Sequence, residues 1–250
     1  MKSYILLFFL FIISCKENDT KIKNEQKNIL QDIKRENVSI KDEIFHFQFN
    51  KDKNERKNAD IFGKQSSDRF NIEKETIQLD GISDFIEVYN SLHLNPEKEI
   101  TISIWYKPDS YKGVGQNSIL WKPNQNTKAP YCQYFFSATG NLYPKKPGSF
   151  KFGLSINGKF SHLVTEENTW EPGIWYNLVG TYDGLKMKFY VNGELASQRN
   201  VQGELDIYDT PLLIGKTPYK EYYTSGEYDD LRIFNRALTQ KEVSILSNEK

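Results

Sequence analysis

The sequence contains little cysteine, little histidine and no excess of charge of either sign. Its 250 residues include only Cys15, Cys132 and three histidines, and 33 basic residues balance 33 acidic ones. Balanced charge offers no electrostatic attraction to a polyanion, so we do not expect nucleic acid as a partner. A catalytic cysteine would need a nearby histidine, and His46, His93 and His162 show no placement that suggests one. The H-E-x-x-H, G-x-S-x-G and phosphate-loop motifs are missing as well, so we do not expect an enzyme.

A long hydrophobic run is also missing, except for a short one at the start of the chain. The run from Ile5 to Ile13 follows Lys2 and is too short to span a bilayer, which needs ~20 residues. The segment F-I-I-S-C at 11–15 resembles a bacterial lipobox. This resemblance implies that residues 1–14 are a signal peptide and that lipid is attached to Cys15. The alternatives are an ordinary signal peptide or a short membrane anchor.

The resemblance to a lipobox implies that the protein is lipid-anchored in the bacterial cell envelope; we expect the outer membrane, and the side of that membrane is left open. Several acyl chains give a durable anchor, so the lipid would be the only contact with the membrane. The segment after Cys15 is rich in Lys, Asn, Glu and Gln, and we expect residues 15–42 to form a flexible stalk. Residues 43–250 are a suitable size for one domain. With Cys15 lipidated, Cys132 cannot form an internal disulfide, and we expect it to be buried and inert.

Alternating apolar residues and tight-turn signals predict an antiparallel β domain. Asp183-Gly184 and Asn192-Gly193 suit hairpin turns, and they flank a strand that places Met187, Phe189 and Val191 on one face. Further strands are expected at 44–49, 77–88 (two strands around a bend), 100–106, 150–164 (a hairpin around Asn157-Gly158), 175–182, 211–215 and 227–234. A capping box formed by Thr239 and Glu242 predicts one late helix. The pattern predicts an all-β, two-sheet antiparallel jelly-roll sandwich with one short C-terminal helix.

Six blocks, occurring in the order expected of one family, carry a more specific resemblance. They are L-D-G-I-S-D-F-I-E-V (79–88), I-T-I-S-I-W-Y-K-P-D-S (100–110), P-G-I-W-Y-N-L-V-G-T-Y-D-G (172–184), F-Y-V-N-G-E-L (189–195), L-L-I-G-K (212–216) and G-E-Y-D-D-L-R-I-F-N-R-A-L-T-Q-K-E-V (226–243). Together they resemble the laminin-G-like, concanavalin A-like jelly-roll domains of secreted bacterial proteins. The resemblance covers nearly all of residues 43–247, although 122–147 fits no block. Such domains include glycan binders, adhesion modules and accessory modules of enzymes, so the fold alone does not fix the function.

The strongest indication of catalysis is the acidic segment E-Y-D-D at 227–230. On a strand, Glu227 and Asp229 share one face and Asp230 points to the other. Some glycosidases of this fold carry the pattern E-x-D-x-E, but the third acidic position is Leu231 here. Glycoside hydrolysis is therefore only a weak alternative.

Three carboxylates predict a structural calcium site. Asp80 and Asp84 flank a bend, and the resemblance implies that this bend and Asp230 on the closing strand meet at one end of the sandwich. Calcium prefers several carboxylate and backbone oxygens, often supplied by loops. The alternative is that Asp80 simply caps its own turn.

Aromatic residues make up 14% of the chain and supply the candidate ligand contacts. Trp105 and Trp175 fall in the family-like blocks and are interpreted as structural. The candidates for stacking on a sugar lie in the divergent stretch and in the loop before the last strand: Trp121, Tyr131, Tyr134, Tyr143, Tyr219, Tyr222 and Tyr223. The sequence thus favours non-catalytic binding of a glycan or cell-surface glycoconjugate, with a protein-interaction or adhesion module as the alternative.

Overall fold

The chain divides into two units, Met1–Lys41 and Asp42–Lys250. The computed structural model describes residues 40–49, 59–63, 70–71, 76–110, 116–125, 128–140, 146–218 and 222–249, almost all of which belong to the second unit. The predicted signal peptide, Cys15 and most of the stalk lie outside the described residues and stay predictions. In the ranges that are described, no helix is long and apolar enough to cross a membrane.

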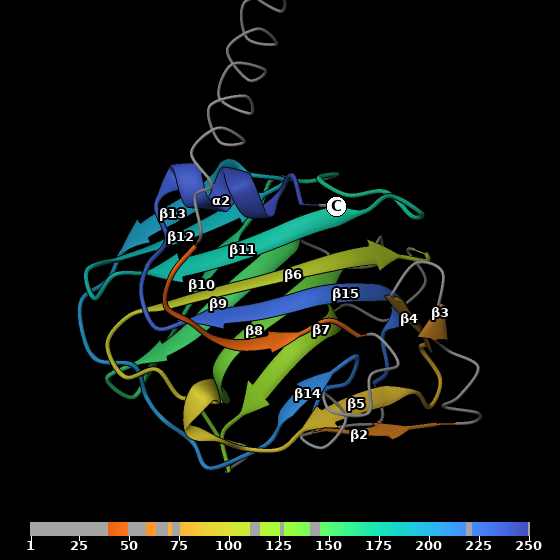
Figure 1. Ribbon diagram of the computed structural model, residues 1–250, viewed down its shortest axis with the longest axis horizontal. Helices are drawn as coiled ribbons and strands as arrows, with labels where there is room; N and C mark the ends of the chain where they lie inside the picture. Colours follow the sequence, from red (N-terminus) through yellow and green to blue (C-terminus); the bar gives the residue numbers. More distant parts are fainter. Residues whose placement is uncertain are drawn as a thin grey trace, which may run out of the picture. The chain divides into compact units, whose positions relative to one another are not determined.

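Two antiparallel sheets form the second unit (Figure 1). The eight-stranded sheet has the order β13-β12-β11-β6-β15-β4-β3, and β1 pairs with β15 as well. Its strands are β1 (Glu43–Phe47), β3 (Phe70–Asn71), β4 (Thr76–Asp80), β6 (Ile100–Pro108), β11 (Tyr176–Tyr182), β12 (Lys186–Val191), β13 (Glu194–Asn200) and β15 (Ser225–Phe234). The beginning of β15 pairs with β4 and its end pairs with β1, so one strand joins two distant parts of the chain.

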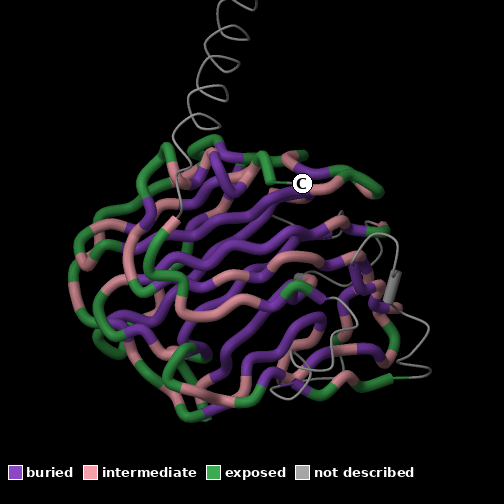
Figure 2. The backbone as a smooth tube through the Cα atoms, viewed as in Figure 1, coloured by how far each residue is buried: buried purple, intermediate pink, exposed green. Residues whose placement is uncertain are grey.

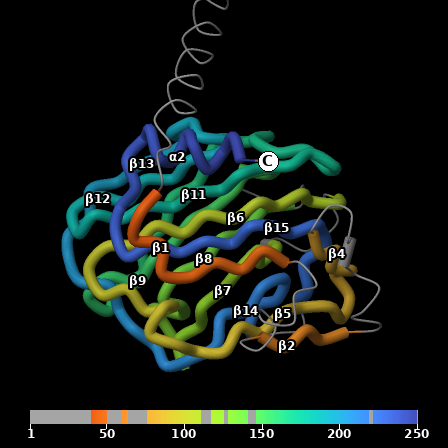
Figure 3. Tube along the Cα trace, in the orientation of Figure 1, coloured from red at the N-terminus to blue at the C-terminus, as the bar shows by residue number. Residues whose placement is uncertain are grey.

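The seven-stranded sheet has the order β10-β9-β8-β7-β14-β5-β2 (Figure 3). Its strands are β2 (Ala59–Phe62), β5 (Phe85–Val88), β7 (Gln116–Pro123), β8 (Cys132–Thr139), β9 (Phe150–Ile156), β10 (Lys159–Val164) and β14 (Leu212–Ile214). A short 3-10 helix, η2 (Leu92–Leu94), and the helix α2 (Gln240–Leu246) complete the described elements. The predicted all-β sandwich with a short C-terminal helix is confirmed, but β7 and β8 lie in a stretch for which the sequence analysis named no strand.

The core lies between the two sheets because each strand turns alternate side chains inward. Ile100, Ile102 and Ile104 of β6 are fully buried, as is Phe152 of β9. Buried residues follow the central strands of both sheets, whereas exposed residues are concentrated in the connections (Figure 2). The sheets approach so closely at Gly180 that an added Cβ would lie 2.4 Å from the Phe152 ring, so glycine is required there.

The two predicted hairpin turns have different chemistry. Asn192 and Gly193 both have positive φ, 50° and 81°, as a two-residue turn of the predicted kind requires. At the other turn only Gly184 has positive φ. Asp183 instead accepts hydrogen bonds from the backbone N–H groups of Leu185 and Lys186 through its carboxylate.

The helix α2 begins at the predicted capping box. The backbone N–H and side-chain hydroxyl of Thr239 both donate to the Glu242 carboxylate, each at 2.8 Å. The preceding segment is fixed to β6, because the Thr101 hydroxyl donates to the carbonyl of Arg236. Thr101 alternates with the inward-facing isoleucines of β6, so α2 is attached on the outer side of the eight-stranded sheet.

Cys132 is buried and free, as predicted. Burial raises the pKa of its thiol well above the ordinary value. A thiol that is buried and protonated is a poor nucleophile, which agrees with an inert role.

Candidate functional site

One end of the seven-stranded sheet carries a group of partly exposed aromatic rings, here called the aromatic shelf: Phe62, Phe85 and Tyr223. Tyr222 is the exposed chain neighbour of Tyr223. Phe62 of β2 lies opposite Phe85 of β5, and their rings stack with centroids 4.5 Å apart and planes 9° apart. The Tyr223 ring lies 6.0 Å from that of Phe85. Ile86 and Val88 of β5 are buried in the core, so Phe85 projects from the outer face of the sheet.

Lys216 joins the shelf through its ammonium group. It forms an isolated β-bridge with Tyr223, which brings the two side chains to the same place. Its Nζ lies 4.3 Å from the ring centroid of Phe85 and 5.4 Å from that of Tyr223. Because β5 lies between β2 and β14, Phe85 has Phe62 on one side and the Lys216 ammonium on the other. The site therefore combines flat apolar rings with a cation, which an aromatic face attracts.

The predicted carboxylate bend adjoins the shelf. Gly63 follows Phe62, and a Cβ at this position would lie 1.9 Å from Oδ1 of Asp84, which is 2% exposed. Tyr223 leads into Ser225, which pairs with Asp80 in the sheet. The structure thus brings together two segments that the sequence analysis had treated as separate sites.

Asp80 caps its own turn. Its Oδ1 accepts hydrogen bonds from the backbone N–H groups of Ile82, Ser83 and Asp84 at 2.8, 2.9 and 2.9 Å. The backbone N–H of Asp80 in turn donates to Oδ2 of Asp84 at 3.3 Å. These contacts are the turn chemistry that the sequence analysis gave as the alternative to a calcium site.

Asp230 lies elsewhere, which corrects the predicted set of calcium ligands. It is five residues beyond Ser225 along β15, or ~16 Å at the usual rise of a strand. There it contacts His46 Nε2 at 2.6 Å and Arg232 Nε at 2.9 Å. Burial raises its pKa, but these two partners outweigh burial and hold the pKa of the Asp230 carboxyl below its ordinary value.

The three carboxylates therefore do not form a common site. Throughout the described part of the chain, no group of three or more His, Cys, Asp or Glu side chains is placed to hold a metal ion. Calcium binding itself stays a prediction, without Asp230 among its ligands.

Two of the predicted aromatic contacts are packed inside the domain. Tyr134 is fully buried, and its hydroxyl donates to the carbonyl of Leu94 at 3.2 Å. Its assignment as a ligand contact was wrong, because it lies on the inward face of β8 and not in a loop. Trp121 is 9% exposed and packs against Phe135 with ring centroids 4.8 Å apart. Little of its ring is available to a ligand.

Tyr131 and Tyr222 are each 45% exposed, but they lie at opposite ends of the sheet. Tyr131 accepts a hydrogen bond from Asn124, just beyond the end of β7, whereas Lys216 and its neighbours lie beyond the other end of β14. Because Leu213 pairs with Trp121 in antiparallel register, Asn124 is level with position 210. Lys216 is six residues farther along, which is ~20 Å at the usual rise of a strand. The predicted contacts Tyr143 and Tyr219 lie outside the described residues.

The sequence analysis missed Phe62, Phe85 and Lys216. Phe85 stands in the first family-like block, where its alternation with Ile86 indicates an outward position. No local pattern indicates that it meets Phe62 and Lys216, because that depends on the pairing of β5 with β2 and β14.

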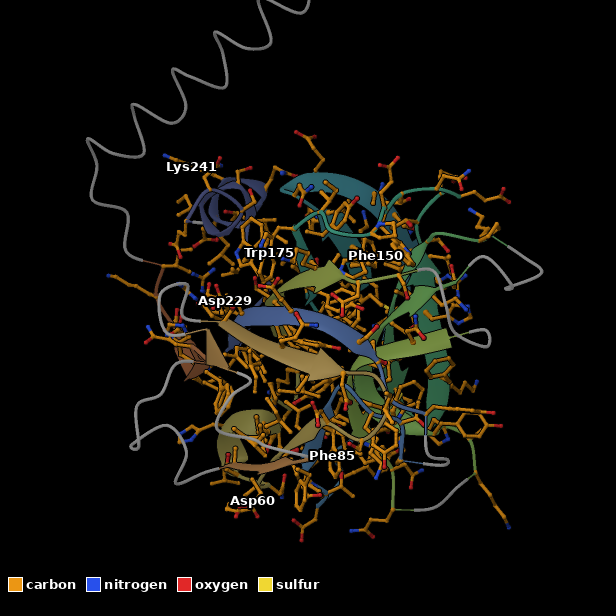
Figure 4. All side chains as sticks on the ribbon, turned by 90° about the vertical axis from the view of Figure 1, so that its right-hand side faces the viewer. Asp60, Phe85, Phe150, Trp175, Asp229 and Lys241 are labelled. Carbon is orange, nitrogen blue, oxygen red and sulfur yellow. The ribbon has the colours of Figure 1, made fainter. Side chains whose placement is uncertain are left out.

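The acidic segment of β15 is engaged in structural contacts. As predicted, Glu227 and Asp229 share a face of the strand, where Glu227 pairs with Lys107 and Asp229 lies opposite Trp105. Glu227 forms an ion pair with Lys107, whose Nζ is also 5.5 Å from the ring centroid of Trp175. Figure 4 shows Trp175 and Asp229 away from the end that carries Phe85 and Asp60.

Comparison with known proteins gives a family match and a set of similar folds. Residues 80–244 match a laminin G-like family described as the concanavalin A-like lectin/glucanases superfamily. No curated protein matches the sequence.

Among solved structures, the ligand-binding domain of botulinum neurotoxin serotype D, in complex with N-acetylneuraminic acid, is 17% identical with a TM-score of 0.61. That match covers 84% of this chain and 51% of the toxin chain. The binding domain of Paraclostridial Mosquitocidal Protein 1 is also 17% identical, with a TM-score of 0.54 over 76% of this chain and 45% of that chain. The binding domain of botulinum neurotoxin serotype G is 14% identical, with a TM-score of 0.56 over 82% and 50%. This chain thus spans about half the length of these structures, and at such low identity the likeness shows the fold alone.

Proposed function

Because the chain belongs to the concanavalin A-like lectin/glucanases superfamily, we propose that its domain binds a carbohydrate or a cell-surface glycoconjugate without catalysis. The observation that carries the proposal is the aromatic shelf. Phe62 of the shelf is 40% exposed, and Tyr222, the chain neighbour of Tyr223, is 45% exposed. Exposed flat rings beside polar groups suit the C–H faces and hydroxyls of a sugar.

We also propose that the protein is a lipoprotein of the bacterial cell envelope, anchored through Cys15. This part rests on the lipobox-like segment at 11–15 alone. Mass spectrometry of the protein from membranes should find acyl chains on an amino-terminal Cys15. Substitution Cys15→Ser should release the protein from the membrane fraction; continued membrane attachment of this variant would contradict the anchor.

A broad glycan array, probed with the full chain, tests the binding proposal. We expect hits from one class of sugar, and we would compare them in calcium and in EDTA to test the calcium prediction as well. A blank array in both conditions, from protein with a folded circular dichroism spectrum, would contradict glycan binding.

A pair of matched variants then locates the site. The double substitution Tyr222→Ala and Tyr223→Ala should weaken binding about tenfold or more, because an aromatic stacking contact contributes roughly 0.5–1.5 kcal/mol beyond its buried area and two rings are removed. Tyr131→Ala is the control, since Tyr131 has the same exposure as Tyr222 and lies at the other end of the sheet. Isothermal titration calorimetry measures both, and equal losses would remove the shelf from the site.

A protein-interaction or adhesion module is the second candidate, and the edge strand β13 favours it. The strand is seven residues long, most of its residues are exposed, and it pairs with only one described neighbour, β12. An exposed edge can add a strand from a partner protein. Capture of a protein that free sugars do not displace would favour this candidate.

A further inference from the structure

We infer that the glycan bound at the aromatic shelf is an acidic one, and that Lys216 binds its carboxylate. The inference rests on the proposed function and names the class of ligand for the same site. It is drawn from the position of the Lys216 ammonium group, which the aromatic rings hold at the surface of the shelf.

The rings restrict the Lys216 side chain. Its Nζ lies near two ring faces, at 4.3 Å from the centroid of Phe85 and 5.4 Å from that of Tyr223. A free lysine side chain has several rotatable bonds, and ordering it on binding costs affinity. Here much of that ordering is already achieved in the folded protein.

The ammonium group is also available to an anion. Within the described ranges Lys216 forms no ion pair, whereas Lys107 pairs with Glu227 and Lys146 pairs with Glu166. An aromatic face attracts a cation but accepts no strong hydrogen bond, so the N–H donors of Lys216 can still bind a carboxylate.

Two carboxylates mark the far side of the same face. Asp60 pairs with Glu87 across β2 and β5. This pair is two residues, or ~7 Å, along the strands from the pair formed by Phe62 and Phe85, so it lies on the same face of the sheet. Asp60 accepts a hydrogen bond from the hydroxyl of Tyr89, an interaction that raises the pKa of Tyr89. The face therefore has a cationic side at Lys216 and an anionic side at Asp60 and Glu87.

An acidic sugar matches this polarity. Its ring can stack on the exposed side of Phe62, its carboxylate can accept from Lys216, and its hydroxyls can donate to Asp60 and Glu87. A neutral sugar can stack in the same way but leaves Lys216 without an anion. A charge-assisted hydrogen bond is about twice as strong as a neutral one, so the carboxylate should raise affinity about tenfold.

Matched sugar pairs test the inference with the full chain. The probes are sialyllactose with its methyl ester and oligogalacturonate with its methyl ester, because the members of each pair differ only at the carboxylate. Isothermal titration calorimetry at low salt gives the affinities. We expect the acidic member of at least one pair to bind about tenfold more tightly, and this preference to shrink as salt screens the charge.

Variants at Lys216 assign the preference to that side chain. Lys216→Met keeps an unbranched apolar chain over the rings and should abolish the preference, so that the acidic member binds no more tightly than the neutral one. Lys216→Arg keeps the charge and should retain the preference. Lys159→Met, an exposed lysine on the opposite edge strand β10, is the control and should change nothing.

The outcomes separate this inference from the proposed function. Equal binding of acidic and neutral members, or a preference that survives Lys216→Met, overturns the inference but leaves glycan binding intact. Binding of no member of either pair, together with a blank array, overturns both.

Discussion

Two lysines at opposite ends of the seven-stranded sheet have opposite surroundings. Lys122 of β7 is fully buried, and its Nζ donates to Asn90 Oδ1 at 2.9 Å and to the carbonyls of Tyr208 and Thr210 at 2.8 and 2.5 Å. Lys216 lies partly exposed over aromatic rings. The same functional group thus joins three segments of chain at one end and faces solvent at the other.

This difference between the two lysines indicates which end of the sheet can bind a ligand. At the Lys122 end each of the three ammonium hydrogens has an acceptor within the protein, so no donor is left for a ligand. At the Lys216 end the ammonium group has no hydrogen-bond acceptor among the described residues, and aromatic surface remains exposed. Substitutions at the Lys122 end should therefore lower the stability of the fold, and substitutions at the Lys216 end should lower the affinity for a ligand.

Breaking the Lys122 end should have the largest effect. Lys122→Met removes the donor from the part-buried carbonyl of Tyr208 and the buried carbonyl of Thr210. It should lower the free energy of unfolding by ~3 kcal/mol, because polar groups left without a partner in the interior keep their desolvation cost. Urea denaturation measures the change. As a control, Lys159→Met at an exposed position should lower the free energy of unfolding by less than ~0.5 kcal/mol. An equally small effect of Lys122→Met would contradict a stabilising role for the hydrogen bonds of Lys122.

The next largest effect is expected for a substitution that disturbs the backbone beside the aromatic shelf. Gly63 has φ of 127°, and a Cβ there would meet the Asp84 carboxylate at 1.9 Å. Gly63→Ala should lower stability by ~2 kcal/mol and displace Phe62, so glycan affinity should fall as well.

Gly158→Ala is the control for that variant. Gly158 also has positive φ, 71°, but a Cβ there would meet nothing within 4 Å, so only the backbone cost of ~1 kcal/mol is expected. Equal losses of stability in the two variants would show that contact with Asp84 contributes nothing.

The pH dependence of the unfolding free energy tests the surroundings of Lys122 separately. Burial lowers the pKa of Lys122 from 10.5 to about 8, with Asp209 opposing the shift. Between these values the unfolded chain binds a proton that the native state lacks, so this residue makes stability rise with pH, by at most ~1.4 kcal/mol per pH unit. Below about pH 8 both states are protonated and the contribution is constant. The difference in unfolding free energy between wild type and Lys122→Met isolates this residue, and a flat difference from pH 8 to 10 would contradict the shift.

The smallest effect is expected for Lys216→Met on stability. A cation–π contact at a partly exposed site contributes about 0.5–1 kcal/mol, and the methionine chain keeps the apolar contact with the rings. The loss should therefore stay within ~1 kcal/mol. Thermal and urea unfolding check it, and a loss as large as that of Lys122→Met would erase the distinction between the two ends.

Much of the fold could be predicted from the sequence, because local chemistry governs it. Alternation at Ile100, Ile102 and Ile104 predicted a strand with one buried face, and the capping box at Thr239 predicted where α2 begins. Both are short-range patterns that tertiary contacts reinforce. The stretch 122–147 was harder, since it fits no block, and a strand read as a loop put the core residue Tyr134 among the ligand contacts.

The candidate site could be predicted only in part. The loop with Tyr222 and Tyr223 was identified from its aromatic residues just before the last strand, and Asp80 from its bend. Asp230 was misplaced because the sequence shows that an acid lies on β15, but not that it pairs with His46 and Arg232.

The sequence by itself determined the β class, the turns and the late helix, since these depend on residues a few positions apart. Only the tertiary structure decided which surfaces meet. Phe62, Phe85 and Lys216 come from distant parts of the chain and lie together because β2, β5 and β14 are neighbours in one sheet. Strand pairing over such separations depends on the packing of the whole core, and no local pattern encodes it.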